Sequence, residues 1–404
     1  RAELSEIEKS IVSRVEQQLR TTVDELATSV DIDSSTENFQ GLRELADFYA
    51  ERFEDIGFET EWVALPESTG RAGHFVAIRE GAEGPRILLI GHLDTVLEGE
   101  RWRIEDQVAY GSGTADMKGG NQVILAALRA LDAEGLLDDR RLAVFFTGDE
   151  ESPGEPVSVV RSRFIDEAKR SDIALAYETA VGDTAVIGRR GIITWELEVR
   201  GQTGHSSGIF SESRGSGAIF EAARILDSFH NSLKEPNVTF NASVIVGGTD
   251  VEFESDKHAG RAHGKTNVVP QRVVAYGDLR FLTAEQRERA TAKMASIVAI
   301  GLPRTSAKIE FFEGYPPMAP TEGNLGLLRQ LDQVSRDLGY GGVTAYDPAK
   351  RGAGDISFVA EYVDALDGLG VHGFHTHAPG ESLDLSTLKQ QISRTAVLIY
   401  RLTR

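Results

Sequence analysis

The chain contains no cysteine, and this absence narrows the chemistry that it can perform. Without thiols there are no disulfide bonds, no thiolate nucleophile and no cysteine-ligated zinc. A metal site in this protein must therefore be built from histidine, aspartate and glutamate. The sequence also lacks an apolar run near the roughly 18 residues that a membrane-spanning helix needs, so we expect no membrane partner.

Positive charge is scarce as well. Lys and Arg number 43 against 63 Asp and Glu, which gives a formal net charge of −20. A field of this sign repels nucleic acid, so the sequence predicts no nucleic-acid partner, and an anionic substrate would need a local basic pocket. The chain begins at Arg1 rather than Met. A removed secretory signal and a cytoplasmic location therefore both stay open.

The first third of the chain has the pattern of an α/β domain. Helices are expected at residues 7–26 and 41–56, with a capping signal at 34–37 between them. Two short apolar runs, RILLIG and LAVFFT, are typical of buried strands, and apolar residues at helical spacing lie between them. This β-α-β alternation predicts an α/β fold with a mixed or parallel sheet covered by helices on both faces.

A different pattern occupies residues 192–312. Strands that alternate apolar and polar residues are expected there, together with two helices, and after Pro316 the buried α/β character resumes. The 404 residues exceed one ordinary compact core. We therefore predict a catalytic domain formed by residues 1–191 and 313–404. The smaller α+β domain at 192–312 would be inserted into it.

Three motifs with polar side chains follow apolar runs, where α/β sheets place their binding sites. GHLDTV contains His92 and Asp94, which share one side of an extended chain, so one could bind a metal while the other orients it. GDEES contains Glu150 and Glu151, adjacent carboxylates that are costly unless they share a cation or a proton. LAYETA contains Glu178. Each of these residues could instead belong to an ordinary turn or a solvated loop.

Two glycine-rich motifs add further donors. YGSGTADMKGG places Asp116 just before an expected helix, where an N-cap is the alternative role. GFHTHAPGES contains His375 and His377, which could also belong to a surface loop. Together the five motifs offer the imidazole and carboxylate ligands that zinc and similar ions take. They are too many for one catalytic metal with an open position, and they suit two metals that share a bridging carboxylate and a water.

In order and spacing, these motifs resemble those of the M20 metallopeptidases, and among them the bacterial glutamate carboxypeptidase (carboxypeptidase G) branch. The resemblance runs from about Glu44 to the C-terminus. It implies two divalent ions, zinc or alternatively cobalt or manganese. The implied metal ligands are His92, Asp116, Glu151, Glu178 and His377.

Within that ligand set, the resemblance implies that Asp116 bridges the two ions. Asp94 would orient His92, and Glu150 would be the general base. The last ligand of the family is followed by Glu four residues later, which favours His377 over its neighbour His375 because Glu381 stands at that distance.

The resemblance also assigns roles to the inserted domain. It implies a homodimer through this domain, with His205 of GQTGHSSG stabilising the oxyanion in the partner's active site; a turn histidine is the alternative. Asn267 of KTNVVP and Arg280 of GDLRF match positions that line the substrate. RGAGDIS departs from the family's GGTD loop, so the group that binds the substrate carboxylate stays open. The candidates for it are Arg351, Lys350, Arg189 and Arg190.

The implied function is hydrolysis of an amide bond next to the free carboxylate of a C-terminal amino acid, as in a carboxypeptidase acting on small peptides. An N-acyl amino acid amidohydrolase or deacylase of the same family is the alternative, because it would share every metal ligand. A binding homologue without activity is a third hypothesis. It is disfavoured by the presence of Glu150 beside a full ligand set.

Overall fold

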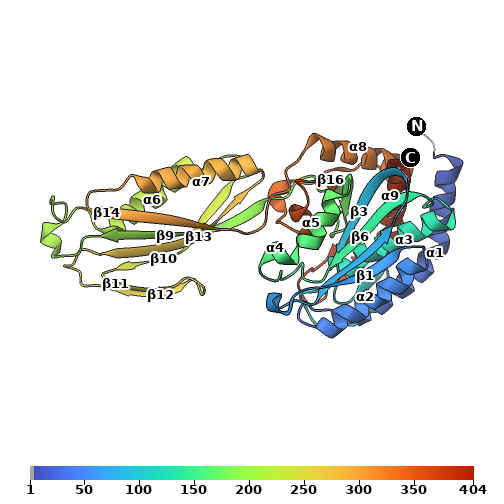
Figure 1. Ribbon diagram of the computed structural model, residues 1–404, viewed down its shortest axis with the longest axis horizontal. Helices are drawn as coiled ribbons and strands as arrows, with labels where there is room; N and C mark the ends of the chain where they lie inside the picture. Colours follow the sequence, from blue (N-terminus) through green and yellow to red (C-terminus); the bar gives the residue numbers. More distant parts are fainter. Residues whose placement is uncertain (1–3) are drawn as a thin grey trace. The chain divides into compact units, whose positions relative to one another are not determined.

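The computed structural model describes residues 4–404, which divide into two compact units (Figure 1). Unit 1 comprises the chain up to Ile187, Pro320–Asp347 and Gly354–Arg404, and unit 2 comprises Gly188–Ala319 and Pro348–Ala353. The segment Pro348–Ala353 thus belongs to unit 2 although it lies outside the predicted insertion. Among residues 4–404, no helix is long and apolar enough to cross a membrane.

Unit 1 is built on a six-stranded mixed sheet. Its strands are β1 (Glu59–Ala64), β2 (Gly73–Arg79), β3 (Glu83–His92), β6 (Arg140–Thr147), β7 (Ile173–Ala176) and β16 (Asp364–Leu366). The order across the sheet is β1-β2-β6-β3-β7-β16. Strands β6, β3, β7 and β16 run parallel to one another. Strand β2 is antiparallel to both of its neighbours, β1 and β6. The two apolar runs expected to be buried strands are confirmed as β3 and β6.

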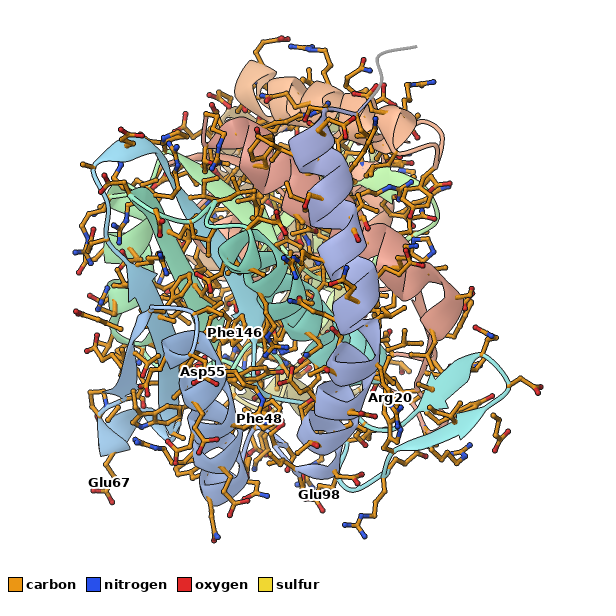
Figure 2. All side chains as sticks on the ribbon, turned by 90° about the vertical axis from the view of Figure 1, so that its right-hand side faces the viewer. Arg20, Phe48, Asp55, Glu67, Glu98 and Phe146 are labelled. Atoms are coloured by element: carbon orange, nitrogen blue, oxygen red, sulfur yellow. The ribbon has the colours of Figure 1, made fainter. Side chains whose placement is uncertain are left out.

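Helices cover both faces of this sheet. They are α1 (Glu6–Asp31), α2 (Phe39–Glu54), α3 (Gly119–Ala133), α4 (Val157–Val160), α5 (Ser162–Lys169), α8 (Glu322–Asp337) and α9 (Leu388–Leu402). Successive residues of a strand point to opposite faces. Accordingly Phe145 packs on Phe164 of α5, with ring centroids 4.8 Å apart, and Phe146 packs on Tyr49 of α2 at 5.1 Å. Figure 2 shows Phe146 inside unit 1, while Glu67 extends outward.

The start of α2 differs from the expected one. Asn38 is its N-cap, and the Asn38 side chain accepts the backbone amide of Gly41 at 3.0 Å. The prediction of a capping signal at residues 34–37 is therefore wrong. Ser34 and Thr36 instead bond to residues 93–95, which follow β3. Side chains of this type serve as caps or as long-range donors depending on tertiary contacts that the local sequence does not reveal.

Unit 2 has a four-stranded antiparallel sheet with two helices on one face (Figure 1). The sheet order is β10 (Thr239–Gly248), β13 (Arg272–Phe281), β9 (Gly191–Gly201) and β14 (Thr305–Phe312); the helices are α6 (Ala218–Ser232) and α7 (Ala284–Ala299). Alternate residues of β9 are buried, and Trp195 packs on Phe229 of α6 with ring centroids 5.9 Å apart. The predicted half-buried strands and both helices are thereby confirmed.

Short strands complete the described chain. A hairpin in unit 2, β11 (Asp250–Glu254) and β12 (Ala259–His263), was not predicted. In unit 1, β4 (Arg103–Glu105), β5 (Val108–Tyr110), β17 (Gly373–Phe374) and β18 (Ser382–Asp384) form a small sheet, and β8 (Thr184–Ala185) pairs with β15 (Thr344–Ala345). The loop between β17 and β18 carries His377, so this small sheet fixes both ends of that loop.

Candidate metal centre

The expected side chains of unit 1 meet at one edge of its large sheet. Strands β6, β3 and β7 are neighbours and run parallel, so their carboxyl ends lie side by side. His92 is the last residue of β3, Glu150 and Glu151 follow β6, and Glu178 follows β7. Three segments that are distant in sequence therefore deliver donors to the same place.

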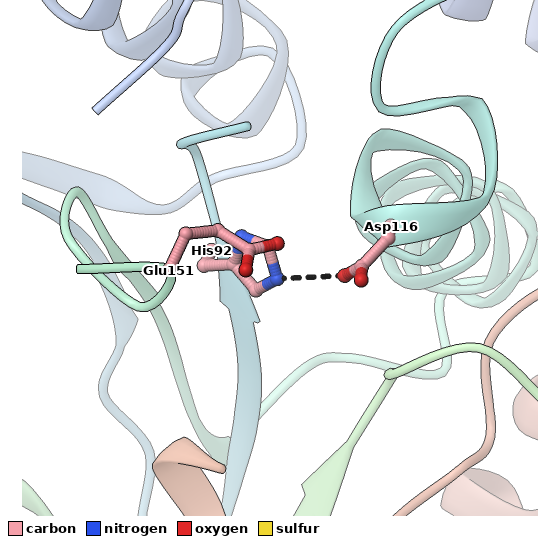
Figure 3. A group of neighbouring side chains, drawn as sticks. All are labelled: His92, Asp116 and Glu151. Atoms are coloured by element: carbon pink, nitrogen blue, oxygen red, sulfur yellow. Dashed lines mark hydrogen bonds and ion pairs between the residues drawn. The ribbon is translucent and has the colours of Figure 1, made fainter. Parts of the chain in front are cut away.

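His92 is the centre of a first group of donors. Its side chain is fully buried, and its Nε2 lies 3.1 Å from Asp116 Oδ1, 3.6 Å from Glu178 Oε1 and 3.9 Å from Glu150 Oε2. Figure 3 shows His92 facing Asp116 from the end of its strand. Atoms at these separations could share one ion, because His92, Glu150 and Glu178 offer ligand atoms within 4.8 Å of one another.

His377 forms a second group with the same aspartate. Its Nε2 lies 3.0 Å from Asp116 Oδ2 and 3.0 Å from Glu151 Oε2, and its side chain is 53% exposed. Asp116 thus presents one oxygen to His92 and the other to His377. His375 is also exposed, but neither of these two distances involves it. The structure therefore brings together the five side chains that the family resemblance singled out as ligands.

Asp116 lies in a tight turn, Thr114–Lys118, and not at the N-cap of α3. The carboxylate of Glu381 holds this turn by accepting the backbone amides of Gly113 at 2.8 Å, Ala115 at 3.1 Å and Asp116 at 2.8 Å. In the sequence, Glu381 is marked only by its spacing of four residues from His377. Its contacts show that it fixes the backbone that carries the shared aspartate.

Asp94 lies behind His92 and supports two parts of the site. His92 Nδ1 lies 2.9 Å from the backbone oxygen of Asp94 and 3.4 Å from its carboxylate. The carboxylate also accepts the amides of Glu150 at 3.0 Å and Glu151 at 3.1 Å, and the hydroxyl of Thr36 at 2.7 Å. Sequence reasoning did not identify Thr36, since nothing in the local pattern links it to Asp94.

The carboxylates of the cluster are poorly solvated, and this shifts their proton affinities. Burial, followed by the neighbouring Glu178, raises the pKa of Glu150 well above its usual value. Burial and Asp116 raise the pKa of Glu178. Burial raises the pKa of Glu151 to about 7. A raised carboxyl pKa means that the negative charge lacks compensation at that place.

The two histidines respond in the opposite way to the same charges. Burial disfavours protonated His92, but Glu178 and Asp116 outweigh it and raise the pKa of His92 well above its usual value. Hydrogen bonds to Asp116 and Glu151 raise the pKa of His377 to about 11. In the absence of a bound cation, protons on these imidazoles would supply the positive charge that the site demands.

This donor set fits divalent cations. Five carboxylates, those of Asp94, Asp116, Glu150, Glu151 and Glu178, surround two imidazoles. Within residues 4–404, the side chains that form ion pairs with these carboxylates are the two histidines. Nitrogen and oxygen donors of this kind are those that zinc and related ions select. Cations in the two donor groups would relieve the excess negative charge.

In unit 2, the loops that carry His205 and Asn267 lie together. The backbone oxygen of Asn267 accepts the amide of Ser206 at 2.8 Å, and His205 pairs with Val268 in an isolated bridge. Both His205 and Asn267 are exposed. His205 Nδ1 accepts the backbone amide of Ser207 at 3.2 Å, so a neutral imidazole carries its proton on Nε2. His205 therefore offers an N–H donor to solvent.

Arg280 lies near the opposite end of the unit 2 sheet, close to the segment that carries Arg351. Arg280 pairs with Thr239 across the sheet, and Arg190 donates to the Thr239 hydroxyl at 2.8 Å. Arg190 also donates to Ala349 O at 3.2 Å. Arg189 Nε donates a hydrogen bond to Gly352 O at 2.5 Å. Within unit 2, the expected substrate-side residues thus form two separate groups at the two ends of the sheet.

The fold and the cluster correspond to a known class of hydrolase. Residues 88–401 match the family model described as peptidase family M20/M25/M40, so the chain belongs to this family of metallopeptidases. A carboxypeptidase G2 from Pseudomonas sp. (strain RS-16) is 27% identical over 390 residues, covering 92% of this chain and 86% of that protein. A succinyl-diaminopimelate desuccinylase from Methylorubrum populi is 31% identical over 285 residues, covering 63% and 69%.

Solved structures show the same fold at lower sequence identity. The aminopeptidase PepT from Bacillus cereus superposes with a TM-score of 0.73 at 19% identity, covering 96% of this chain and 99% of that one. The YXEP protein of Bacillus subtilis, described as a dinuclear metal binding peptidase of the M20 family, has a TM-score of 0.64 at 14% identity, with 96% and 99% covered. These likenesses confirm the mixed α/β architecture.

Proposed function

We propose that this chain is a two-metal exopeptidase that hydrolyses the amide bond next to a free C-terminal carboxylate, as a glutamate carboxypeptidase does. The observation that carries this proposal is the position of Asp116, which faces His92 with one oxygen and His377 with the other. A carboxylate placed in this way suits a bridge between two ions. The similarity to a carboxypeptidase G2 supports the substrate class.

Two divalent ions would occupy the cluster. His92 and Glu178 would hold one ion, Glu151 and His377 the other, and Asp116 would bind both. Zinc is the preferred metal for these donors, with cobalt or manganese as alternatives. When bound, such ions polarise a carbonyl and lower the pKa of a water towards neutrality. The solved M20 peptidase described as dinuclear supports two ions over one.

Glu150 is the residue that we propose as general base. Its side chain is 14% exposed and lies on the Glu178 side of His92, and Asp94 fixes its backbone amide. In this position it would take the proton of the attacking water and later deliver it to the leaving amine. Burial raises its pKa, which favours a carboxyl group that can hold a proton between these two steps.

His205 would stabilise the oxyanion that forms when water attacks, and the Nε2–H that its tautomer exposes is the donor this needs. We propose that it acts in the partner's site of a homodimer. Within unit 2 it lies beyond the end of β9, whose 11 residues separate it by about 30 Å from Gly188, where the chain enters from unit 1. A residue so far from the connection is well placed to serve a second chain, and Asn267 lies beside it.

Arg351 is the group that we propose for the substrate carboxylate. Among residues 4–404, Arg280 is paired with Asp278 at 3.1 Å and Arg189 is bound to Gly352, whereas no ion pair occupies the Arg351 guanidinium. A guanidinium that is not already neutralised is the better ligand for an anionic substrate. The net charge of −20 makes such a local positive group necessary.

An N-acyl amino acid amidohydrolase is the second candidate, and the similarity to a succinyl-diaminopimelate desuccinylase favours it. Both reactions break an amide bond and could use the same metal ligands. They differ in the group on the acyl side, which would contact parts of the pocket that the metal cluster does not define. A homologue that binds without turnover is disfavoured because Glu150 would then have no role.

Product analysis on a small substrate panel tests the proposal. The zinc-loaded protein is given dipeptides with C-terminal glutamate, N-acyl amino acids, and the same compounds with an amidated carboxyl terminus. Release of a free C-terminal amino acid, abolished by amidation, is the expected result. Glu150→Gln should retain its metal and lower kcat by roughly 100-fold or more. Equal cleavage of amidated substrates, or an active Glu150→Gln variant, would refute the assignment.

A further inference from the structure

Arg161 is a fully buried arginine that bonds to two carboxylates from distant parts of unit 1. It lies between α4 and α5, and its side chain has no solvent exposure. Its Nη1 donates to Asp149 Oδ1 at 2.6 Å, and its Nε donates to Asp355 Oδ1 at 3.1 Å. The second oxygen of Asp149 accepts the amide of Gly154 at 2.8 Å, and Asp355 also accepts the hydroxyl of Thr147. The network is therefore fixed on several sides.

This network holds the turn that carries Glu150. Asp149 immediately precedes Glu150, and Arg161 binds it from one side. From the other side, Asp94 accepts the amides of Glu150 and Glu151 at 3.0 and 3.1 Å. Hydrogen bonds to the Asp94 carboxylate on one side and to the Arg161 guanidinium on the other therefore fix the position of the turn. A shift on either side would move Glu150 and Glu151 with respect to the other donors.

The same guanidinium reaches the segment next to Arg351. Asp355 begins the short turn Asp355–Phe358, which follows Pro348–Ala353 with Gly354 between them. Arg161 also lies over the ring of Phe358, with its guanidinium carbon 5.2 Å from the ring centroid. The turn Asp355–Phe358 of unit 1 is therefore anchored by the residue that anchors the Glu150 turn.

Stability alone is a weak reason for such a network. A buried ion pair gains little over well-packed apolar side chains, because both charges must leave water. Here one arginine faces two buried aspartates, and the adjacent His74 does not add a charge, since burial lowers its pKa. What the network does provide is directional bonds that define where the turn lies.

We propose that Arg161, acting through Asp149, is a positioning residue that places Glu150 and Glu151 against the metal-binding His92. The proposal rests on the proposed function, in which Glu151 binds metal and Glu150 moves a proton. Partners behind metal ligands typically change metal affinity or activity about 10–100-fold when removed. Arg161 should act at this level although it touches neither metal nor substrate.

The test compares Arg161→Met with Arg161→Lys, and uses Arg86→Met as a matched control. Arg86 is also a buried arginine, paired with Glu167 at 2.6 Å, but it lies near the start of β3, about 20 Å along the strand from His92. Zinc titration by calorimetry and separate kcat and KM values are measured on each full-length variant. A fall of about 10–100-fold in affinity for one zinc ion and in kcat is expected for Arg161→Met, with KM within about threefold.

Arg161→Lys should recover part of both losses, and Arg86→Met should lower thermal stability without changing zinc affinity or kcat. A folded Arg161→Met with unchanged zinc affinity and kcat would overturn the proposal, as would equal losses in Arg86→Met. If Arg161→Met does not fold, Asp149→Asn carries the same expectations, because it keeps the shape and leaves Arg161 paired with Asp355. Wild-type protein without hydrolytic activity would refute the proposed function, while the zinc titration would still test the role of Arg161.

Discussion

The hydroxyl of Thr36 donates a hydrogen bond of 2.7 Å to the carboxylate of Asp94, from a loop 58 residues earlier in the chain. Both residues are buried. Because the same carboxylate holds the amides of Glu150 and Glu151, the loop between α1 and α2 contributes to the order of the metal centre. The N-terminal helices are thereby connected to the site although they supply no ligand.

Replacing Thr36 by valine should disturb the site more than the fold. The variant keeps the shape and removes one donor to a buried carboxylate, which should cost about 1–2 kcal/mol of unfolding free energy. Because the Asp94 carboxylate would lose one of the donors that fix its position, kcat should fall about tenfold. Denaturant unfolding and kcat are the measurements. Thr22→Val is the matched control, since Thr22 is also buried and its hydroxyl donates to the backbone oxygen of Gln18 in its own helix; equal kcat losses in both variants would contradict this role.

Such long-range contacts mark what the sequence could not predict. The chain pattern placed β3 and β6 and offered His92, Asp116 and the pair His375 and His377 as possible donors, because each signal is local: an apolar run, a glycine-rich turn, a His-x-His pair. The family resemblance then selected His377 from that pair. The pairing of Thr36 with Asp94, or of Arg161 with Asp355, joins residues 58 and 194 positions apart. Local propensity carries no information about such pairs.

The metal-free protein should lose stability as the pH rises. The folded-state pKa of Glu151 is raised to about 7 from 4.5, and that of His377 to about 11 from 6.5. The folded state therefore binds more protons than the unfolded state. The stabilisation from protonated Glu151 is complete below pH 4.5 and lost by about pH 7, and that from His377 is lost above pH 6.5 towards about pH 11.

Thermal unfolding of EDTA-treated protein between about pH 5 and pH 8 checks this expectation. The melting temperature should fall steadily over that range. Zinc-loaded protein should show a much flatter profile, because cations then replace the protons and bind better as the ligands deprotonate. A metal-free protein that becomes more stable towards pH 8 would contradict the charge balance described for the cluster.

A mixing experiment examines whether His205 acts across a dimer. His205→Ala should lower kcat by roughly 100-fold or more while leaving thermal stability unchanged, since the side chain is exposed. Mixed with Glu150→Gln, it should form heterodimers with one complete site, so activity should return to about a quarter of the wild-type value. His230→Ala, also exposed, is the control. No recovery in subunit-exchange conditions would rule out the role in trans.

The β11–β12 hairpin and residues 348–353 of unit 2 were not predicted, because their sequences carry no pattern of burial. Alternate residues of β9 are buried, and the matching period of two in its sequence made this strand recognisable. The β11–β12 hairpin has few apolar residues, and every residue of β12 is exposed, so no burial pattern marks it. Residues 348–353 likewise carry no sign that they belong to unit 2. They are held there by Arg189 and Arg190.

The sharing of Asp116 between two metal ions is the central claim, and metal analysis tests it most directly. Purified protein, stripped with chelator, reloaded with zinc and freed of excess ion, should contain close to two zinc ions per chain by mass spectrometry. Asp116→Ala, checked for folding by circular dichroism, should fall below one. A wild-type content of one ion, or an Asp116→Ala variant that keeps two, would contradict the bridged two-metal centre.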